Sequence, residues 1–156
     1  MIFVTTGTHT GFDRLLREVD KIAGIGKIKD EFVVELGNSG FEPKNFKKIK
    51  FLPRREYLKN LKNSDLVIIH GGSGSVLDVL INKKKAIIVP RLKKFREHEN
   101  DHQMDLAQAL EKSGRALAVY KISDLTRKII DAKNFSPKFS SEKSGLINAL
   151  EEFISQ

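Results

Sequence analysis

Several residue types and patterns are missing from this 156-residue chain, and each absence excludes a class of protein. The sequence has no cysteine, so it has neither a disulfide framework nor thiolate chemistry, which fits a reducing cytosol. No apolar run approaches the roughly 18–20 residues of a membrane-spanning helix. The opening MIFVTTG lacks the basic and apolar regions of a secretory signal. Since internal repeats are also absent, we expect one cytoplasmic domain, residues 1–156, that buries its own core.

The charge of the chain is strongly positive, formally +8 at pH 7. Nucleic acids, anionic membranes and phosphorylated ligands are the usual partners of such a basic protein. The sequence has no base-stacking aromatic motif and no recognition helix, so we expect no nucleic-acid partner. A phosphorylated ligand, an anionic membrane surface and an ordinary solvated lysine surface remain as explanations.

Short apolar segments alternate with amphipathic segments along the chain. We predict strands at residues 2–6, 32–36, 49–52, 66–69, 86–89 and 116–120. We predict helices at residues 12–23, 54–63, 76–81, 101–112, 125–132 and 146–154, and an irregular, flexible segment at 133–145. This alternation indicates an α/β fold with an open parallel sheet. Such sheets bind ligands at the carboxyl ends of their strands.

A glycine-rich loop joins the strand at residues 66–69 to the following helix, in the stretch DLVIIHGGSGSVLDVLI. Its three glycines, Gly71, Gly72 and Gly74, let an anion approach the backbone, and the unpaired N–H groups of the helix start attract it. Ser73 and Ser75 add hydroxyl donors. The loop is not a Walker A site, because no Lys-Ser/Thr follows, and its G-G-x-G spacing differs from the dinucleotide fingerprint. A tight turn that merely needs flexible residues is the alternative explanation.

Asp78 favours the ligand explanation. It is the one charged residue in an otherwise apolar helix and lies on the same face as Ser75, three residues earlier. A carboxylate repels phosphates but accepts hydrogen bonds from sugar hydroxyls, as the acidic residue of dinucleotide sites does with ribose. A nucleoside diphosphate with its ribose near Asp78 satisfies both observations.

All four histidines follow predicted strands at the ligand-binding edge. His9 follows the first strand, His70 ends the central strand, and His98 and His102 lie in or beside the loop after residues 86–89. A surface or hydrogen-bonded histidine is the ordinary explanation for any one of them. Four together predict one polar cleft lined by three loops.

The sequence HENDH, from His98 to His102, matches the zinc-protease motif H-E-x-x-H letter for letter. A zinc protease needs both histidines on one face of a stable helix. Here the match spans a predicted helix start, because Asn100 and Asp101 suit a helix cap better than a helix interior. With no third ligand in sight, we expect no metal site. The polar groups of this region suit a nucleotide sugar instead: Glu97, His98, Asp101, His102 and Gln103.

Two stretches of the chain resemble a known enzyme family. One is IFVTTGT with the following FDRL, and the other runs through IIHGGSGS and KKAIIVPR to EHENDHQ, residues 68–103. Both resemble the soluble, donor-binding catalytic subunit of two-component glycosyltransferases, a group that includes PssE/EpsF-like bacterial subunits and the eukaryotic dolichol-linked GlcNAc-transferase subunit. The chain resembles more distantly the MurG-like C-terminal domain of glycosyltransferase family 28. The likeness covers most of the chain through about residue 114.

This resemblance implies the C-terminal, donor-binding half of a GT-B fold. It implies transfer of a hexose, such as GlcNAc, glucuronate or galactose, from a UDP-sugar to a lipid-linked acceptor. A membrane-anchored partner subunit would supply the acceptor site and recruit the chain to the cytoplasmic face of the membrane. No metal or other cofactor is expected, in agreement with the lack of an Asp-x-Asp motif. The alternative is a non-catalytic nucleotide-sugar-binding or regulatory module.

The resemblance also implies roles for individual residues. Gly71–Ser75 would hold the diphosphate, Asp78 the ribose, and His102 and Gln103 the donor sugar. His9 and His102 are the candidates for proton donation, and no catalytic base is assigned. The predicted substrate-binding residues are Gly7, Thr8, His9, His70, Gly71, Gly72, Ser73, Gly74, Ser75, Asp78, Arg91, Glu97, His98, Asp101, His102 and Gln103.

Overall fold

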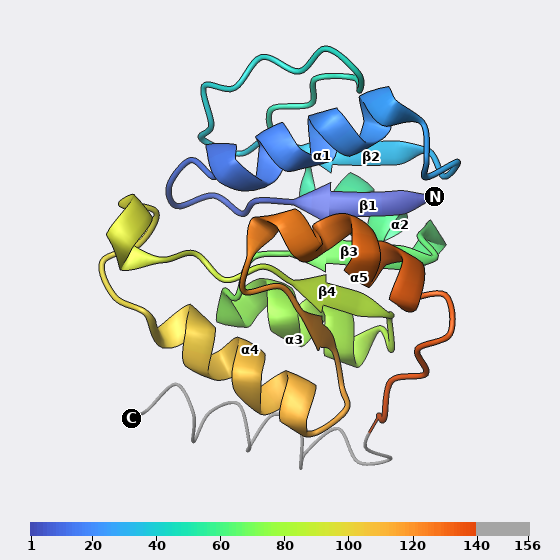
Figure 1. The fold of residues 1–156 in the computed structure, drawn as a ribbon, viewed down its shortest axis with the longest axis vertical. Coiled ribbons are helices and arrows are strands. Elements are labelled where there is room, and N and C mark those ends of the chain that lie inside the picture. Colours follow the sequence, from blue (N-terminus) through green and yellow to red (C-terminus); the bar gives the residue numbers. More distant parts are fainter. Residues whose placement is uncertain (140–156) are drawn as a thin grey trace.

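A computed structural model describes residues 1–139 of the chain (Figure 1). The predicted helix at residues 146–154 lies outside the described residues, as do residues 140–145 of the predicted irregular segment. Within residues 1–139, no helix is long and apolar enough to cross a membrane.

Five parallel strands form one open sheet in the order β2-β1-β3-β4-β5. The strands are β1 (Ile2–Thr5), β2 (Phe32–Glu35), β3 (Leu66–Ile69), β4 (Ala86–Ile88) and β5 (Leu117–Ala118). Every residue of β1, β3 and β4 is buried, because helices cover both faces of the sheet. This burial explains why the strands are continuous apolar runs, and the predicted open parallel α/β sheet is confirmed.

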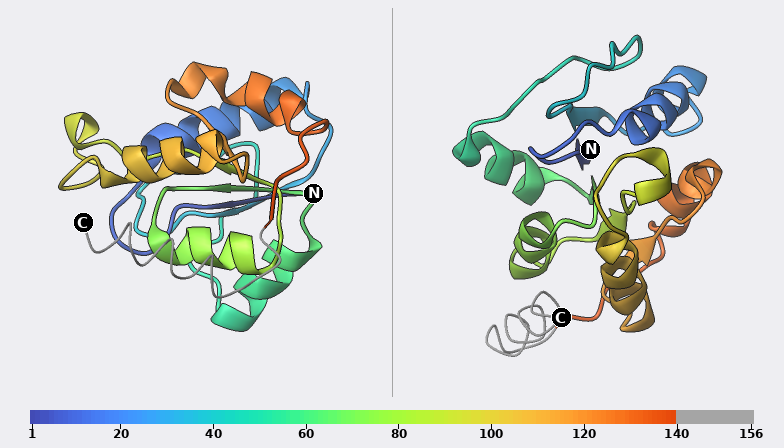
Figure 2. Two further views of the ribbon diagram at one scale, coloured as in Figure 1. Left: turned by 90° about the horizontal axis from the view of Figure 1, so that it is seen from below. Right: turned by 90° about the vertical axis from the view of Figure 1, so that its left-hand side faces the viewer.

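Helices divide the apolar core into two clusters, one on each face of the sheet. The helices are α1 (Asp13–Ile25), α2 (Arg54–Asn63), α3 (Ser73–Ile81), α4 (His102–Lys112) and α5 (Leu125–Asp131), with short 3₁₀ turns η1 (Lys93–Phe95) and η2 (Ile122–Asp124). Helices α1 and α5 pack with one set of strand side chains, whereas α2 and α3 cover the opposite face (Figure 2). Helix α4 contributes Leu106, Ala107 and Leu110 to the α2–α3 cluster.

Residues 49–52 do not form the strand that the sequence predicts. Ile49 makes only an isolated bridge to Glu35, and the carbonyls of Ile49 and Lys50 accept hydrogen bonds from the turn that follows β2. The ladder stops there because the N–H of Leu52 turns to the Glu35 carboxylate (2.8 Å). Pro53 next has no N–H to donate.

Helix α1 also runs further than predicted. Gly24 lies inside the helix, which ends at Gly26 in the left-handed conformation (φ 67°). One glycine near the end of a helix costs only about 1 kcal/mol, and the apolar face on Leu15, Leu16 and Val19 outweighs this cost.

The strand order reverses between β1 and β3. The chain leaves β1 toward β2 on one side and later returns to place β3 on the other side. The loops after β1 and β3 therefore diverge at the carboxyl edge, which is where an open α/β sheet forms a ligand crevice.

Candidate functional site

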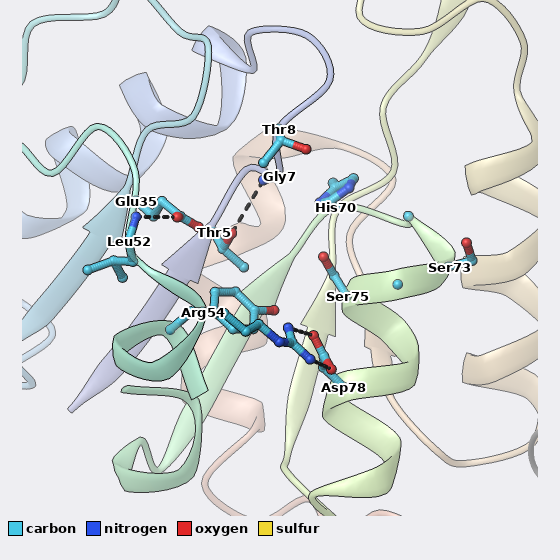
Figure 3. Close-up of a pocket in the computed structure, with 13 residues that line it drawn as sticks. Thr5, Gly7, Thr8, Glu35, Leu52, Arg54, His70, Ser73, Ser75 and Asp78 are labelled. Atoms are coloured by element: carbon cyan, nitrogen blue, oxygen red, sulfur yellow. Dashed lines mark hydrogen bonds and ion pairs between the residues drawn. The ribbon is translucent and has the colours of Figure 1, made fainter. Parts of the chain in front are cut away.

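A cavity of about 450 Å³ opens at this reversal, at the carboxyl ends of β1 and β3 (Figure 3). Eight of the predicted substrate-binding residues line it: Gly7, Thr8, His70, Gly72, Ser73, Gly74, Ser75 and Asp78. Five further lining residues were not predicted: Thr5, Glu35, Leu52, Arg54 and Tyr57. The structure thus brings the glycine-rich loop, the β1 loop and the start of α2 around one space.

The amino-terminal end of α3 forms one wall of the cavity. Gly72 is the N-cap in an extended conformation, and no side chain caps the helix. The first backbone N–H groups of α3 have no carbonyl within the helix to bind, so they are available to an anion. A side chain at Gly74 would meet nothing within 4 Å, which leaves open space beside these donors. Ser75 directs its hydroxyl into the same space (Figure 3).

His70 holds the floor of the cavity between two glycines. A Cβ atom on Gly7 would lie 2.4 Å from the His70 ring, and a Cβ atom on Gly72 would lie 2.3 Å from it. Gly7 also has a positive φ of 73°, which disfavours any side chain. These two positions therefore require glycine, because the imidazole ring occupies the space between the β1 loop and the β3 loop.

The His70 imidazole is uncharged at neutral pH. Burial, helped by the nearby positive charge of Arg91, lowers the pKa of His70 to about 3. Its Nδ1 atom is buried and has no hydrogen-bond partner among residues 1–139. The ring therefore offers the cavity a neutral polar group rather than a cation.

Asp78 lies one turn into α3 and is already paired. Its two carboxylate oxygens accept hydrogen bonds from both terminal nitrogens of Arg54, at 2.6 and 2.5 Å (Figure 3). The Arg54 guanidinium also lies 5.3 Å from the centre of the Tyr57 ring. Arg54 thus links the start of α2 to α3 across the mouth of the cavity.

Glu35 and Tyr57 form the side of the cavity nearest β2 and α2. The buried Glu35 carboxylate accepts hydrogen bonds from the Thr5 hydroxyl (2.7 Å) and from the Leu52 N–H (2.8 Å). Burial raises the pKa of Tyr57 to about 12, so its phenol keeps its proton at neutral pH. Glu35 therefore fixes the segment before α2 against β1.

The four histidines do not line one cleft, and this part of the sequence-based prediction is wrong. Only His70 lines the main cavity. His9 and His98 face a second hollow of about 360 Å³, with their ring centres 6.1 Å apart. His102 is exposed at the start of α4. The loop that carries residues 7–10 passes between the two hollows and separates the histidines.

Two predicted substrate-binding residues, Arg91 and Glu97, form a buried network between the loops after β1 and β4. Arg91 is fully buried, and its Nη2 donates to the carbonyls of Thr6 (2.6 Å) and Thr10. Glu97 receives two hydrogen bonds of 2.8 Å from Arg14 and a third from the Leu92 N–H. A substrate contact by Arg91 would require its guanidinium to leave these carbonyls.

The remaining predicted residues anchor the loops near α4. The Gln103 amide oxygen accepts hydrogen bonds from the N–H groups of Gly71 and Arg91, both at 3.1 Å. Asp101 accepts the N–H of Lys93 at 2.9 Å. Their roles toward a substrate stay predictions.

The position of α4 excludes a zinc-protease motif at HENDH, residues 98–102. This helix begins at His102, so His98 lies outside it and the two histidines do not share a helix face. The part of the chain that the structure describes also has no group of three or more side chains suited to hold a metal ion.

A stricter use of the sheet-edge rule could have predicted some of the missed residues. Glu35 is a charged residue near the end of one predicted strand, Leu52 ends the next predicted strand, and Arg54 follows it closely. Tyr57 gave no signal beyond its inward helical position, because its place beside the cavity depends on how α2 packs.

Comparisons with known proteins agree with this geometry. The sequence model of the glycosyltransferase family 28 C-terminal domain matches residues 1–156. The chain is 34% identical over 122 residues to the human UDP-N-acetylglucosamine transferase subunit ALG13, covering 72% of the chain and 10% of that protein. It is 28% identical over 132 residues to a UDP-N-acetylglucosamine–N-acetylmuramyl-(pentapeptide) pyrophosphoryl-undecaprenol N-acetylglucosamine transferase of Wolbachia (strain wRi), covering 71% of the chain and 37% of that protein.

Solved structures show the same fold. An NMR solution structure of ALG13 matches with a TM-score of 0.67 at 18% identity, covering 99% of this chain and 96% of that chain. The glycotransferase of kitacinnamycin matches with a TM-score of 0.62 at 16% identity, covering 97% of this chain and 39% of that chain. The chain spans only about a tenth of the human relative and about a third of the Wolbachia relative.

Proposed function

The chain belongs to the glycosyltransferase family 28 C-terminal domain family, and from this premise we propose that it is the donor-binding subunit of a UDP-sugar-dependent hexosyltransferase. The observation that carries the proposal is the cavity at the β1–β3 reversal. An uncapped helix start and a carboxylate one turn further along the same helix line one wall of it. This pair of groups fits the diphosphate and the ribose of one nucleotide.

The backbone N–H groups at the start of α3 bind the diphosphate, with the Ser75 hydroxyl beside them. During transfer, the bond between the sugar and the diphosphate breaks and negative charge grows on the departing UDP. Fixed N–H donors and the positive end of α3 stabilise that charge without rearranging. Asp78 accepts hydrogen bonds from the ribose hydroxyls, and no metal ion is needed for these contacts.

N-acetylglucosamine is the sugar that the relatives favour, since both the human and the Wolbachia relatives are named as transferases of it. The side chains outside the main cavity that suit the sugar or the acceptor are those of the second hollow, His9 and His98 among them. His9 and His102 remain the candidates for proton donation.

The acceptor site lies on a second subunit in this proposal. The human relative is named a subunit, and the Wolbachia relative's name specifies a pyrophosphoryl-undecaprenol acceptor. Two basic regions of this chain, residues 47–55 and 83–96, suit work beside anionic lipid. We therefore propose a membrane-anchored partner that brings the chain to the cytoplasmic face and presents a lipid-linked acceptor.

Calorimetry with UDP and its 2′,3′-dideoxy analogue tests the donor site. We expect the wild-type chain to bind UDP about tenfold more tightly than the analogue, because Asp78 accepts the hydroxyl hydrogen bonds. The Asp78→Ala variant should bind UDP more weakly by about 1–3 kcal/mol and should no longer distinguish the two ligands.

The matched control is Asp105→Ala, which removes an exposed carboxylate from α4. It should behave as the wild type. Equal UDP affinities of the wild type and Asp78→Ala would remove Asp78 from the site, and a wild type that binds no UDP would overturn the proposed function.

A further inference from the structure

The main cavity has an electrostatic mismatch with the ligand proposed for it. Among the lining residues within the described part of the chain, Arg54 is the only Lys or Arg, whereas Glu35 and Asp78 are both carboxylates. His70 adds no positive charge at neutral pH. The side chains around the cavity therefore carry a net negative charge, although a nucleoside diphosphate is itself an anion.

Arg54 makes an ion pair with Asp78 in the structure. Both terminal nitrogens of Arg54 contact the Asp78 carboxylate in a two-pronged pair, at 2.6 and 2.5 Å. The same pair competes with the ribose hydroxyls for the two oxygens of Asp78. It also directs the Arg54 guanidinium at Asp78 rather than at a diphosphate.

The two partners differ in how firmly they are held. The Asp78 side chain is 16% exposed and sits on the wall of α3, whereas the Arg54 side chain is 63% exposed at the first turn of α2. Because Arg54 is exposed, water can replace the hydrogen bonds that its guanidinium gives up on leaving Asp78, which lowers the free-energy cost of separating the pair. The pair therefore opens by movement of Arg54 rather than Asp78.

The diphosphate site is within a short movement of Arg54. Asp78 follows Gly74 by four residues, so the two positions lie about one helical turn apart, about 6 Å along the axis, on the same face of α3. Rotations about the side-chain bonds of Arg54 cover such a distance while its Cα stays in α2. Figure 3 shows the guanidinium between the start of α2 and Asp78, on the side of α3 that also carries Ser75.

We propose that Arg54 is an exchangeable counter-ion of the donor site: it neutralises Asp78 in the empty protein and transfers to the ligand's diphosphate on binding, which frees Asp78 for the ribose. This inference rests on the proposed function and adds a residue to it. The exchange makes recognition of the two parts of the nucleotide interdependent. A nucleoside without phosphates gives Arg54 no new partner, so the cavity discriminates against it.

The test compares UDP with uridine by calorimetry on the full chain and on Arg54→Ala. We expect Arg54→Ala to weaken UDP binding about tenfold, the effect of losing one charge-assisted contact. Uridine binding should stay unchanged or become tighter, because Asp78 no longer has to leave a partner. The preference for UDP over uridine should thus fall by about tenfold or more.

Arg55→Ala is the matched control, because it removes the same charge from the next, exposed residue of α2. It should keep the wild-type preference. If Arg54→Ala weakens the binding of UDP and uridine by the same factor, or changes neither, the exchange is overturned while the donor site stands. A wild type that binds neither ligand would overturn the proposed function as well.

Discussion

His70 shows how a single side chain shapes the cavity. Its ring fills the space between Gly7 and Gly72, so both loops approach closely enough to form one floor. The buried imidazole stays uncharged at neutral pH, because burial lowers the pKa of His70 to about 3. The cavity is thereby kept free of a titrating cation across the physiological range.

Protonation of His70 should destabilise the fold. The unfolded chain binds a proton at His70 below its ordinary pKa of 6.5, whereas the folded chain does not until about pH 3. Stability therefore rises with pH across this window and is lost as the pH falls through it. We expect His70 to account for about 2 kcal/mol of lost stability between about pH 6.5 and 4.5.

Urea unfolding of the wild type and His70→Asn over this pH range measures the effect. The variant should lose less stability on acidification, and His102→Asn, at an exposed histidine, should follow the wild type. Parallel curves for the wild type and His70→Asn, or an NMR titration of the His70 ring with a pKa near 6.5, would contradict the assignment.

At the scale of elements, the loops around the site are held by side chains that the sequence suggested for another purpose. Glu97 and Arg91 connect α1, the β1 loop and the β4 loop, and their predicted contact with a substrate stays a prediction. Gln103 of α4 does the same for the loops after β3 and β4. These contacts position the site, because Arg91 and Gln103 join the loops that carry the cavity-lining and hollow-lining residues.

The Arg14–Glu97 pair should matter for stability. Both side chains are largely buried, and Glu97→Gln would leave the Arg14 guanidinium without a counter-charge. We expect a loss of about 2–4 kcal/mol in the free energy of unfolding, measured with urea. The exposed neighbour Glu99→Gln should change it by less than about 0.5 kcal/mol. Similar values for the two variants would show that the pair does not clamp the loops.

The sequence predicts the elements better than the contacts between loops. The bounds of α2 and β3 follow from apolar periodicity and from Pro53, and the structure has both as predicted. Residues 49–52 have the apolar character of a strand, but the Glu35 carboxylate competes for the Leu52 N–H. The same limit applies to the cavity: its glycine loop and Asp78 are visible in one stretch of sequence. Arg54 and Glu35 lie at the ends of other segments, and the specific pairing of Arg54 with Asp78 depends on how α2 packs beside α3.

At the scale of the whole molecule, the proposed function makes the chain one wall of a transfer site. Its main cavity lies at the open edge of the sheet and contains groups suited to a nucleotide. Transfer also requires an acceptor held against the donor sugar, and much of the rate comes from that positioning. The formal charge of +8 would favour a location beside an anionic surface.

A reconstituted assay with a lipid-linked acceptor separates the contributions of the two proposed subunits. We expect no turnover by this chain alone or by a candidate membrane partner alone, and turnover by the two together. A chelator such as EDTA should leave the rate unchanged, since no step is assigned to a metal. Full turnover by the isolated chain would refute the two-subunit proposal even if every donor contact is correct.

An amide NMR titration of the full chain with UDP-N-acetylglucosamine tests whether the β1–β3 cavity binds a UDP-sugar. We expect saturable shifts concentrated on the start of α3, at Gly72, Gly74 and Ser75, and on the backbone of Leu52 across the cavity. The absence of saturable shifts, or shifts confined to the hollow of His9 and His98, would contradict it.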